Sequence, residues 1–160
     1  MEPVLANCRE ISVVTVRNQA GEAQTYPPVG MEFDPQLNSV RTVVVPADIS
    51  VVQSAEAVEL AERVVGLLDG VGVFAIEMFI TADEKLLINE ISPRVHNSGH
   101  ISLDASNVSQ FEQHVRAVLN LPLLPIIAAA PAVMLNILYT PEMLAHCPPG
   151  PRTIRLTESG

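Results

Sequence analysis

Residues 73–91 read VFAIEMFITADEKLLINEI, and this stretch decides which fold the chain can adopt. Two apolar segments flank the polar sequence ADEK, a pattern that predicts a β-hairpin. If Ala82 faces Lys85 across the turn, counting outward along both strands places Glu77 opposite Glu90. The pattern therefore predicts two carboxylates side by side on an antiparallel ladder.

The predicted carboxylate pair needs a compensating charge. Side chains directly opposite one another have Cβ atoms about 4.5–5.5 Å apart, and like charges at that distance destabilise the sheet. Mg²⁺ is commonly bound by one or two carboxylates together with phosphates and waters. We therefore predict that Glu77 and Glu90 are metal ligands, with Asn89 on the opposite face if the pleat is regular. A purely structural role stays open, since a one-residue shift in register would separate the pair.

Polar side chains gather in the segment SPRVHNSGH at 92–100, which follows the hairpin. Pro93 directs the chain out of the sheet, and Gly99 permits a tight turn or a close backbone approach. Arg94 is suited to bidentate recognition of a carboxylate or phosphate, and His96 to proton transfer near neutral pH. The segment is predicted to bind an anion beside the carboxylate pair.

The remaining sequence predicts strands interleaved with two helices. Each helix begins at a capping-box pattern, Ser50 to Gln53 and Ser109 to Glu112. Apolar spacing predicts a buried stripe on the second helix, and strand-like composition marks four further segments. Strands interleaved with helices indicate an α+β layer fold. The stripe comprises Phe111, Val115 and Val118, and the further strands cover 10–17, 22–26, 41–45 and 132–139.

Composition limits the partners that the chain can have. Its 160 residues carry a net charge of −9, so no nucleic-acid partner is expected. Lys85 is the single lysine, so lysines that contact phosphates must come from outside this chain. Cys8 and Cys147 have no metal-like spacing and suit a reducing cytosol, which predicts a cytoplasmic protein. Prolines interrupt the apolar stretch 119–138, which argues against a membrane span.

Two strings in the sequence resemble a known family. GVFAIEMFITADEKLLINEISPRVHNSGH at 72–100 and SQFEQHVRAVLNLPL at 109–123 resemble the N5-carboxyaminoimidazole ribonucleotide synthases of the ATP-grasp family. The resemblance implies a fragment of the ATP-grasp large subdomain, with a mostly antiparallel sheet and two main helices. Residues 1–130 would form the C-terminal half of the ATP-grasp domain, and residues 131–160 the start of the C-terminal subdomain. The implied reaction is the ATP-dependent carboxylation of 5-aminoimidazole ribonucleotide by bicarbonate, through carboxyphosphate, in purine biosynthesis.

The resemblance also implies roles for individual residues, with ATP and Mg²⁺ as cofactors. Glu77 and Glu90 match the magnesium ligands of the family. Arg94 and His96 match catalytic residues placed around bicarbonate and carboxyphosphate. The implied substrate-binding positions are Arg94, His96, Asn97 and Ser98, and the implied ATP-binding positions are Glu2, Val4, Leu5, Glu10, Asn89 and Glu90.

Some positions depart from the family pattern. Phe33 stands where the family usually has a histidine, and the segment PGPR at 149–152 lacks the lysine and Gly-His of the family's tail motif. The family's amino-terminal domain would precede Met1 in the same or another chain, so the isolated chain is expected to be inactive. The family tends to form homodimers. Two alternatives stay open: another ATP-grasp carboxylate–amine ligase, and a non-catalytic interaction module derived from this fold.

Overall fold

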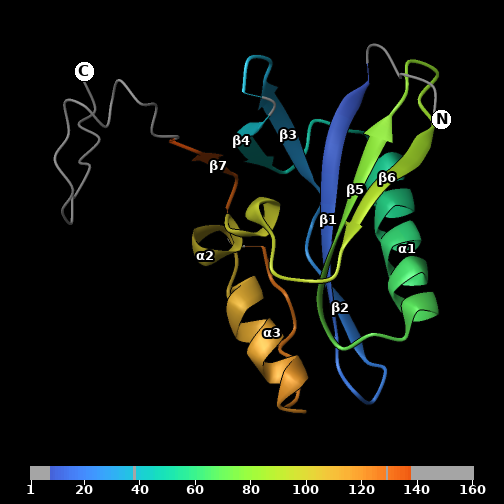
Figure 1. The fold of residues 1–160 in the computed structure, drawn as a ribbon, viewed down its shortest axis with the longest axis vertical. Coiled ribbons are helices and arrows are strands. Elements are labelled where there is room, and N and C mark those ends of the chain that lie inside the picture. Colours follow the sequence, from blue (N-terminus) through green and yellow to red (C-terminus); the bar gives the residue numbers. More distant parts are fainter. Residues whose placement is uncertain (1–7, 38, 129, 138–160) are drawn as a thin grey trace, which may run out of the picture.

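The computed structural model describes residues 8–37, 39–128 and 130–137. Within them, seven strands form one antiparallel sheet in the order β6-β5-β1-β3-β4-β7, and β2 pairs with the end of β1 (Figure 1). The strands are β1 (Arg9–Arg17), β2 (Ala23–Thr25), β3 (Val29–Asp34), β4 (Ser39–Val45), β5 (Gly72–Ile80), β6 (Leu86–Ser92) and β7 (Ala132–Leu135). The helices are α1 (Val51–Leu68), α2 (Ser102–Ala105) and α3 (Gln110–Val118), with a 3₁₀ turn at Asn97–Gly99.

Helices cover both faces of the sheet, α1 on one side and α2 with α3 on the other (Figure 1). Alternate side chains of a strand point to opposite faces. On β1, Ile11 and Val13 therefore pack toward α1, and Val14 and Val16 pack toward Ala117 of α3. The predicted α+β class is confirmed, with a mostly antiparallel sheet and two main helices; α2 is a single turn.

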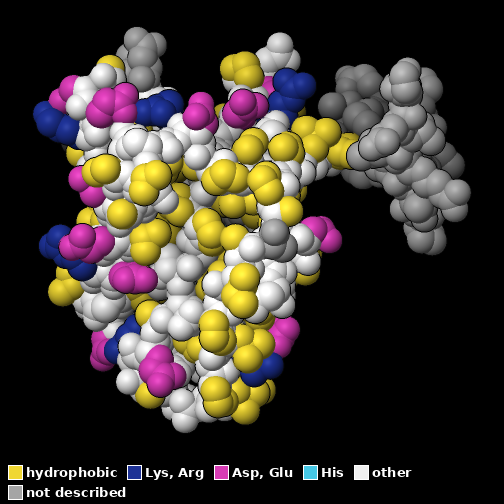
Figure 2. All heavy atoms as spheres, turned by 180° about the vertical axis from the view of Figure 1, so that it is seen from behind, with side chains coloured by type: hydrophobic (Ala, Val, Ile, Leu, Met, Phe, Trp, Pro, Cys, Tyr) yellow, Lys and Arg dark blue, Asp and Glu magenta, His cyan; other side chains and the backbone are white. Residues whose placement is uncertain are grey.

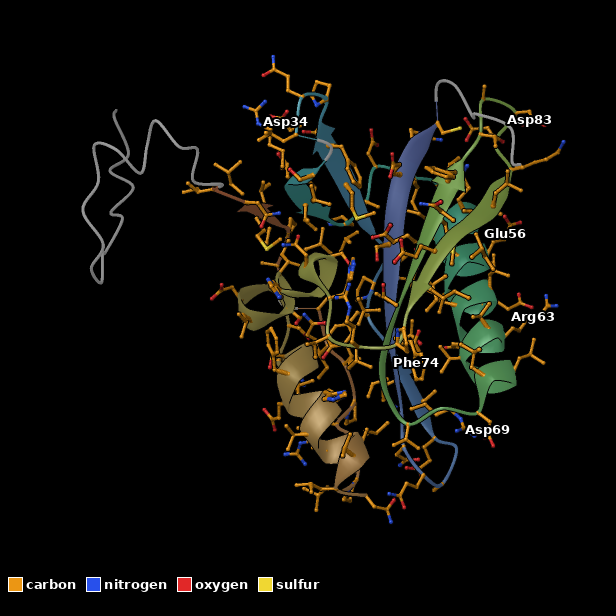
Figure 3. The ribbon with its side chains drawn as sticks, in the orientation of Figure 1. Asp34, Glu56, Arg63, Asp69, Phe74 and Asp83 are labelled. Carbon is orange, nitrogen blue, oxygen red and sulfur yellow. The ribbon has the colours of Figure 1, made fainter. Side chains whose placement is uncertain are left out.

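Helix α1 forms as its capping pattern predicts. The hydroxyl of Ser50 accepts the backbone N–H of Gln53, whose side chain in turn accepts the backbone N–H of Ser50. The helix ends at Asp69, which adopts the left-handed conformation. Figure 3 shows Glu56 and Arg63 projecting from α1 away from the sheet, as expected for the solvent side of an amphipathic helix.

Helix α3 occurs where it was predicted, but the predicted buried stripe is wrong. Val115 is 53% exposed and Val118 is 49% exposed. The face turned toward the sheet instead carries Gln110, Gln113 and Ala117, all fully buried. The helix can bury two glutamines because both side-chain amides are hydrogen-bonded to backbone groups of neighbouring segments.

Strand β3 was not among the predicted strands. Its sequence VGMEFD contains a glycine and two acidic residues, which are poor strand formers. The segment nevertheless pairs with β1 on one side and β4 on the other. Tertiary pairing outweighs the weak local preference of these residues.

The outer surface carries both charged and apolar side chains. On the face shown in Figure 2, Lys and Arg side chains are scattered among Asp and Glu, and hydrophobic side chains cover much of the area between them. No helix within the described residues is both long and apolar enough to cross a membrane.

Candidate active site

Three facing positions on neighbouring strands form the centre of the candidate site. Ser12 of β1 lies opposite Glu77 of β5, and Glu77 lies opposite Glu90 of β6. Facing residues of antiparallel strands project to the same side, so the three side chains make a row across the sheet. Glu10, two residues before Ser12, shares this face. It is the same face that α3 covers further along the strands, at Val14.

The predicted pairing of Glu77 with Glu90 is confirmed, although the turn differs from the prediction. Thr81 and Lys85 close the hairpin, with the N–H of Thr81 donating to the carbonyl oxygen of Lys85 at 3.0 Å. Counting outward from that closure would pair Glu77 with Asn89. A β-bulge shifts the register by one residue directly after Glu77, with Asn89 as the extra residue, and so brings the two glutamates face to face.

The charge around Glu77 suits a bound cation. Its side chain is 13% exposed. Burial is the main factor that raises the pKa of Glu77; the charges of Glu90 and Glu10 add to it, and Arg94 opposes it. No group of three or more His, Cys, Asp or Glu residues is arranged to hold a metal within the described part of the chain. Two facing carboxylates are a ligand set that a hard divalent cation can use when phosphates and waters supply its remaining ligands.

His96 presents its ring to this pair. Its Nε2 atom lies 3.4 Å from Oε1 of Glu77. Its Nδ1 atom accepts the backbone N–H of Ser98 at 3.4 Å and lies 2.9 Å from the Ser98 hydroxyl. Because Nδ1 is an acceptor, the neutral ring carries its proton on Nε2, toward Glu77. Burial, followed by the charge of Arg94, lowers the pKa of His96 from its ordinary value of 6.5, which favours the neutral ring.

A buried pair of serines supports the ring from behind. The Oγ atoms of Ser12 and Ser98 lie 2.8 Å apart, and both residues are fully buried. With Nδ1 of His96 as the acceptor, Ser98 donates to the ring and accepts from Ser12. A chain of hydrogen bonds therefore runs from Ser12 of β1 through Ser98 to Nδ1 of His96, whose Nε2 lies 3.4 Å from Glu77.

Arg94 and Asn97 are placed differently from His96. Arg94 is exposed and donates to the carbonyl oxygen of Val95 at 3.0 Å, while its charge acts on both Glu77 and His96. Asn97 and Asn136 exchange two amide hydrogen bonds of 3.0 Å each. Asn136 follows β7, so this pair connects the 92–100 segment, which follows β6, to the opposite edge of the sheet. The Asn97 amide retains one donor and one acceptor position for a ligand.

The predicted nucleotide-binding residues lie partly within the described chain. Glu10 lines a cleft of about 350 Å³ together with Arg9, Met31 and Phe33. Burial raises the pKa of Glu10. Asn89 is exposed on the bulge beside Glu90. The positions Glu2, Val4 and Leu5 lie outside the described residues.

Sequence reasoning missed three residues that hold the site together, namely Ser12, Gln110 and Asn136. Ser12 carried a usable signal, because it is a polar residue in an otherwise apolar run two positions after Glu10. Gln110 and Asn136 carried none, since their partners lie 14 and 39 residues away in the sequence.

Comparison with known proteins identifies the family of the chain. The family model described as the ATP-grasp domain matches residues 1–111. N5-carboxyaminoimidazole ribonucleotide synthase of Bacillus subtilis is 43% identical over 129 residues, which cover 81% of this chain and 33% of that protein. The chain spans between about a fifth and a third of the length of the curated relatives that it matches.

Solved structures show the same likeness. N5-carboxyaminoimidazole ribonucleotide synthetase from Thermotoga maritima is 46% identical with a TM-score of 0.77, over 86% of this chain and 36% of that one. N5-carboxyaminoimidazole synthase from Aspergillus clavatus, solved with ADP and 5-aminoimidazole ribonucleotide, is 34% identical with a TM-score of 0.78, over 83% and 36% respectively. With the family model matching more than half of its residues, the chain belongs to the ATP-grasp family.

Proposed function

We propose that this chain supplies part of the active site of a ligase that uses ATP to carboxylate 5-aminoimidazole ribonucleotide with bicarbonate. The observation that carries the proposal is the facing of Glu77 and Glu90, with Nε2 of His96 lying 3.4 Å from Glu77. The names of the relatives support the same reaction, and the Aspergillus clavatus protein was solved with ADP and this ribonucleotide.

In this proposal the sheet holds the metal and the nucleotide. Glu77 and Glu90 would bind Mg²⁺, and Asn89 and Glu90 would contact the phosphates from the bulge. The bound ion would neutralise charge on the phosphoryl group that ATP transfers to bicarbonate. Glu10 would hold the ribose hydroxyls in its cleft. The remaining positions proposed for the nucleotide, around its adenine, are Glu2, Val4 and Leu5.

The 92–100 segment would act on bicarbonate and the ribonucleotide. Arg94 would orient anionic oxygens through its guanidinium group. His96 would donate a hydrogen bond from Nε2, and the hydroxyls of Ser98 and Ser12 behind Nδ1 would allow a proton to move through the ring. Asn97 and Ser98 would contact the substrate. Holding these groups in one geometry is how the site would favour the reaction.

The wider organisation follows from the same proposal. Residues 1–130 would form the C-terminal half of the ATP-grasp domain, and residues 131–160 would begin the next subdomain. An N-terminal domain in the same or another chain would supply the lysines for the nucleotide phosphates. A homodimer and a cytoplasmic location would fit an enzyme of purine biosynthesis.

An ATPase assay on the full-length gene product tests the proposal. ADP release should require both bicarbonate and 5-aminoimidazole ribonucleotide. Glu77→Gln should abolish the Mg²⁺-dependent turnover, because it removes one of the two facing carboxylates. Glu56→Gln, on the outer face of α1 (Figure 3), is the matched control and should turn over at the wild-type rate. Retained turnover in Glu77→Gln, or ADP release that is independent of both substrates, would contradict the proposed function.

A further inference from the structure

Helix α3 buries two glutamine side chains that lie three residues apart on one face. Gln110 and Gln113 are both fully buried. A buried amide needs partners for its donor and acceptor groups, and each of these two finds both on a single residue of another segment. Gln110 binds the backbone of His96, and Gln113 binds the backbone of Leu124.

The two glutamines make the same two-point contact. His96 donates its N–H to Oε1 of Gln110 at 3.0 Å, and Nε2 of Gln110 donates to the carbonyl oxygen of His96 at 2.6 Å. Leu124 donates its N–H to Oε1 of Gln113 at 3.1 Å, and Nε2 of Gln113 donates to the carbonyl oxygen of Leu124 at 2.6 Å. Each side-chain amide thus accepts from the N–H and donates to the carbonyl oxygen of one residue, as the backbone of a neighbouring β-strand would do. One contact holds the candidate site and the other holds a segment elsewhere.

The chain around Gln110 is shaped to accept this contact. The backbone N–H of Gln110 donates to the hydroxyl of Ser102 at 2.9 Å, and that hydroxyl donates to the carbonyl oxygen of Gly99 at 2.5 Å. A Cβ atom at Gly99 would collide with the side-chain amide of Gln110. A side chain at position 99 would displace that amide from its two contacts, so glycine at this position lets the start of α3 pack closely against the 92–100 segment.

His96 is consequently held at two places. Gln110 fixes both polar groups of its backbone, and Ser98 engages Nδ1 of its ring. With the backbone and one ring nitrogen fixed, the other ring nitrogen has little freedom and faces Glu77 at 3.4 Å. We propose that Gln110 is a positioning residue that sets the place of the His96 imidazole. Its importance for catalysis rests on the proposed function, but the positioning itself does not.

Because the two glutamines make matching contacts, each can serve as the control for the other in an experiment on this chain without any ligand. Gln110→Met and Gln113→Met each replace a side chain by an apolar one of similar size and leave two backbone groups unpaired. Hydrogen exchange is followed at the amides of His96 and Leu124, and the ¹⁵N resonances of the His96 ring report its tautomer at pH 7. Gln110→Met should lower the protection of the His96 amide by about fivefold or more, as expected for one lost hydrogen bond, and should mix the ring tautomers. Gln113→Met should lower protection at Leu124 and leave the His96 ring in its Nε2-protonated form.

A purely structural role for Gln110 predicts a different result. Both variants would then unfold at lower temperature while the His96 ring kept its tautomer, and that outcome overturns the proposal. Equal disturbance of the ring by both variants also overturns it. If the methionine variants do not fold, Gln110→Glu and Gln113→Glu are compared with the wild type at neutral pH, because an ionised glutamate can accept the backbone N–H but cannot donate to the carbonyl oxygen. The His96 ring should then mix its tautomers in the first variant alone, and an unchanged ring there overturns the proposal. Absence of Mg-ATP binding would count against the proposed function and leave these results standing.

Discussion

Nε2 of His96 lies 3.4 Å from Oε1 of Glu77. At this distance the two groups would form an ion pair if the ring were protonated and the carboxyl group ionised. Here the pKa of His96 is lowered and that of Glu77 is raised, in each case chiefly by burial. Both shifts favour the neutral form of the group. A cation beside Glu77 would offset the burial and the neighbouring carboxylates that disfavour its charge, which sets the direction of the first two predictions.

Glu77→Gln should stabilise the metal-free chain at pH 7. The folded-state pKa of Glu77 is above its ordinary 4.5, so its contribution to stability is complete below pH 4.5 and is lost as pH rises through the folded-state pKa. At pH 7 the ionised wild type then faces Glu90 at a cost of about 0.2–1 kcal/mol, which the substitution removes. Urea denaturation at pH 4 and pH 7 should show a difference between the two proteins only at pH 7.

Mg²⁺ provides the second arm of that experiment. It should raise the unfolding temperature of the wild type at pH 7 and leave Glu77→Gln unchanged, since ligands that bind only the folded state stabilise it. Glu56→Gln on the exposed face of α1 should respond to Mg²⁺ as the wild type does. An equal response of Glu77→Gln would show that the ion binds elsewhere.

Arg94→Gln should raise two pKa values at once. The charge of Arg94 lowers the pKa of both Glu77 and His96, so removing it should move both upward. Because the folded-state pKa of His96 is depressed, the stability it contributes is present above pH 6.5 and lost as pH falls through the folded-state pKa; the variant's folded-state pKa lies closer to 6.5, so it should lose less stability on acidification. Titration followed by NMR measures both groups. Arg116→Gln on α3 is the control, and unchanged values in Arg94→Gln would refute the electrostatic role.

Ser98→Ala should destabilise the chain by about 1–3 kcal/mol, because it leaves the buried hydroxyl of Ser12 without its partner. The double variant Ser12→Ala with Ser98→Ala should cost less than the sum of the two single changes, since the orphaned group is then also gone. Urea denaturation of the four proteins gives the coupling. Additive costs would mean that the two hydroxyls do not interact in solution.

The orientation of α3 can be tested by substitutions on its two faces. Ala117→Leu should cost about 1–3 kcal/mol, because Ala117 is fully buried against the sheet and a larger side chain overpacks it. Val118→Ser should change the stability by no more than about 0.5 kcal/mol, because Val118 is half exposed. Thermal unfolding in two variants suffices. A larger loss of stability in Val118→Ser than in Ala117→Leu would instead support the buried stripe predicted from the apolar spacing.

Local sequence accounted for the hairpin and both helix starts. The facing of Glu77 and Glu90 was correctly predicted, but the predicted turn was one residue off and the bulge at Asn89 compensated for it. The apolar spacing of α3 gave the wrong buried face, because spacing shows only which residues are hydrophobic. A polar residue can also be buried where backbone groups from distant segments hydrogen-bond to it. Strand β3 was missed for a related reason, since its ladder partners come from β1 and β4.

The sequence by itself determined the α+β class, the carboxylate pair and the polar segment after it, because hairpin pairing, capping boxes and the break at Pro93 act over a few residues. Only the tertiary structure decided what holds His96. Ser12, Gln110 and Asn136 reach the 92–100 segment from β1, α3 and the end of β7, and each contact joins parts of the chain far apart in sequence. Hydrogen bonds of this kind leave no periodic pattern, so they become visible only when the sheet and its helices are assembled.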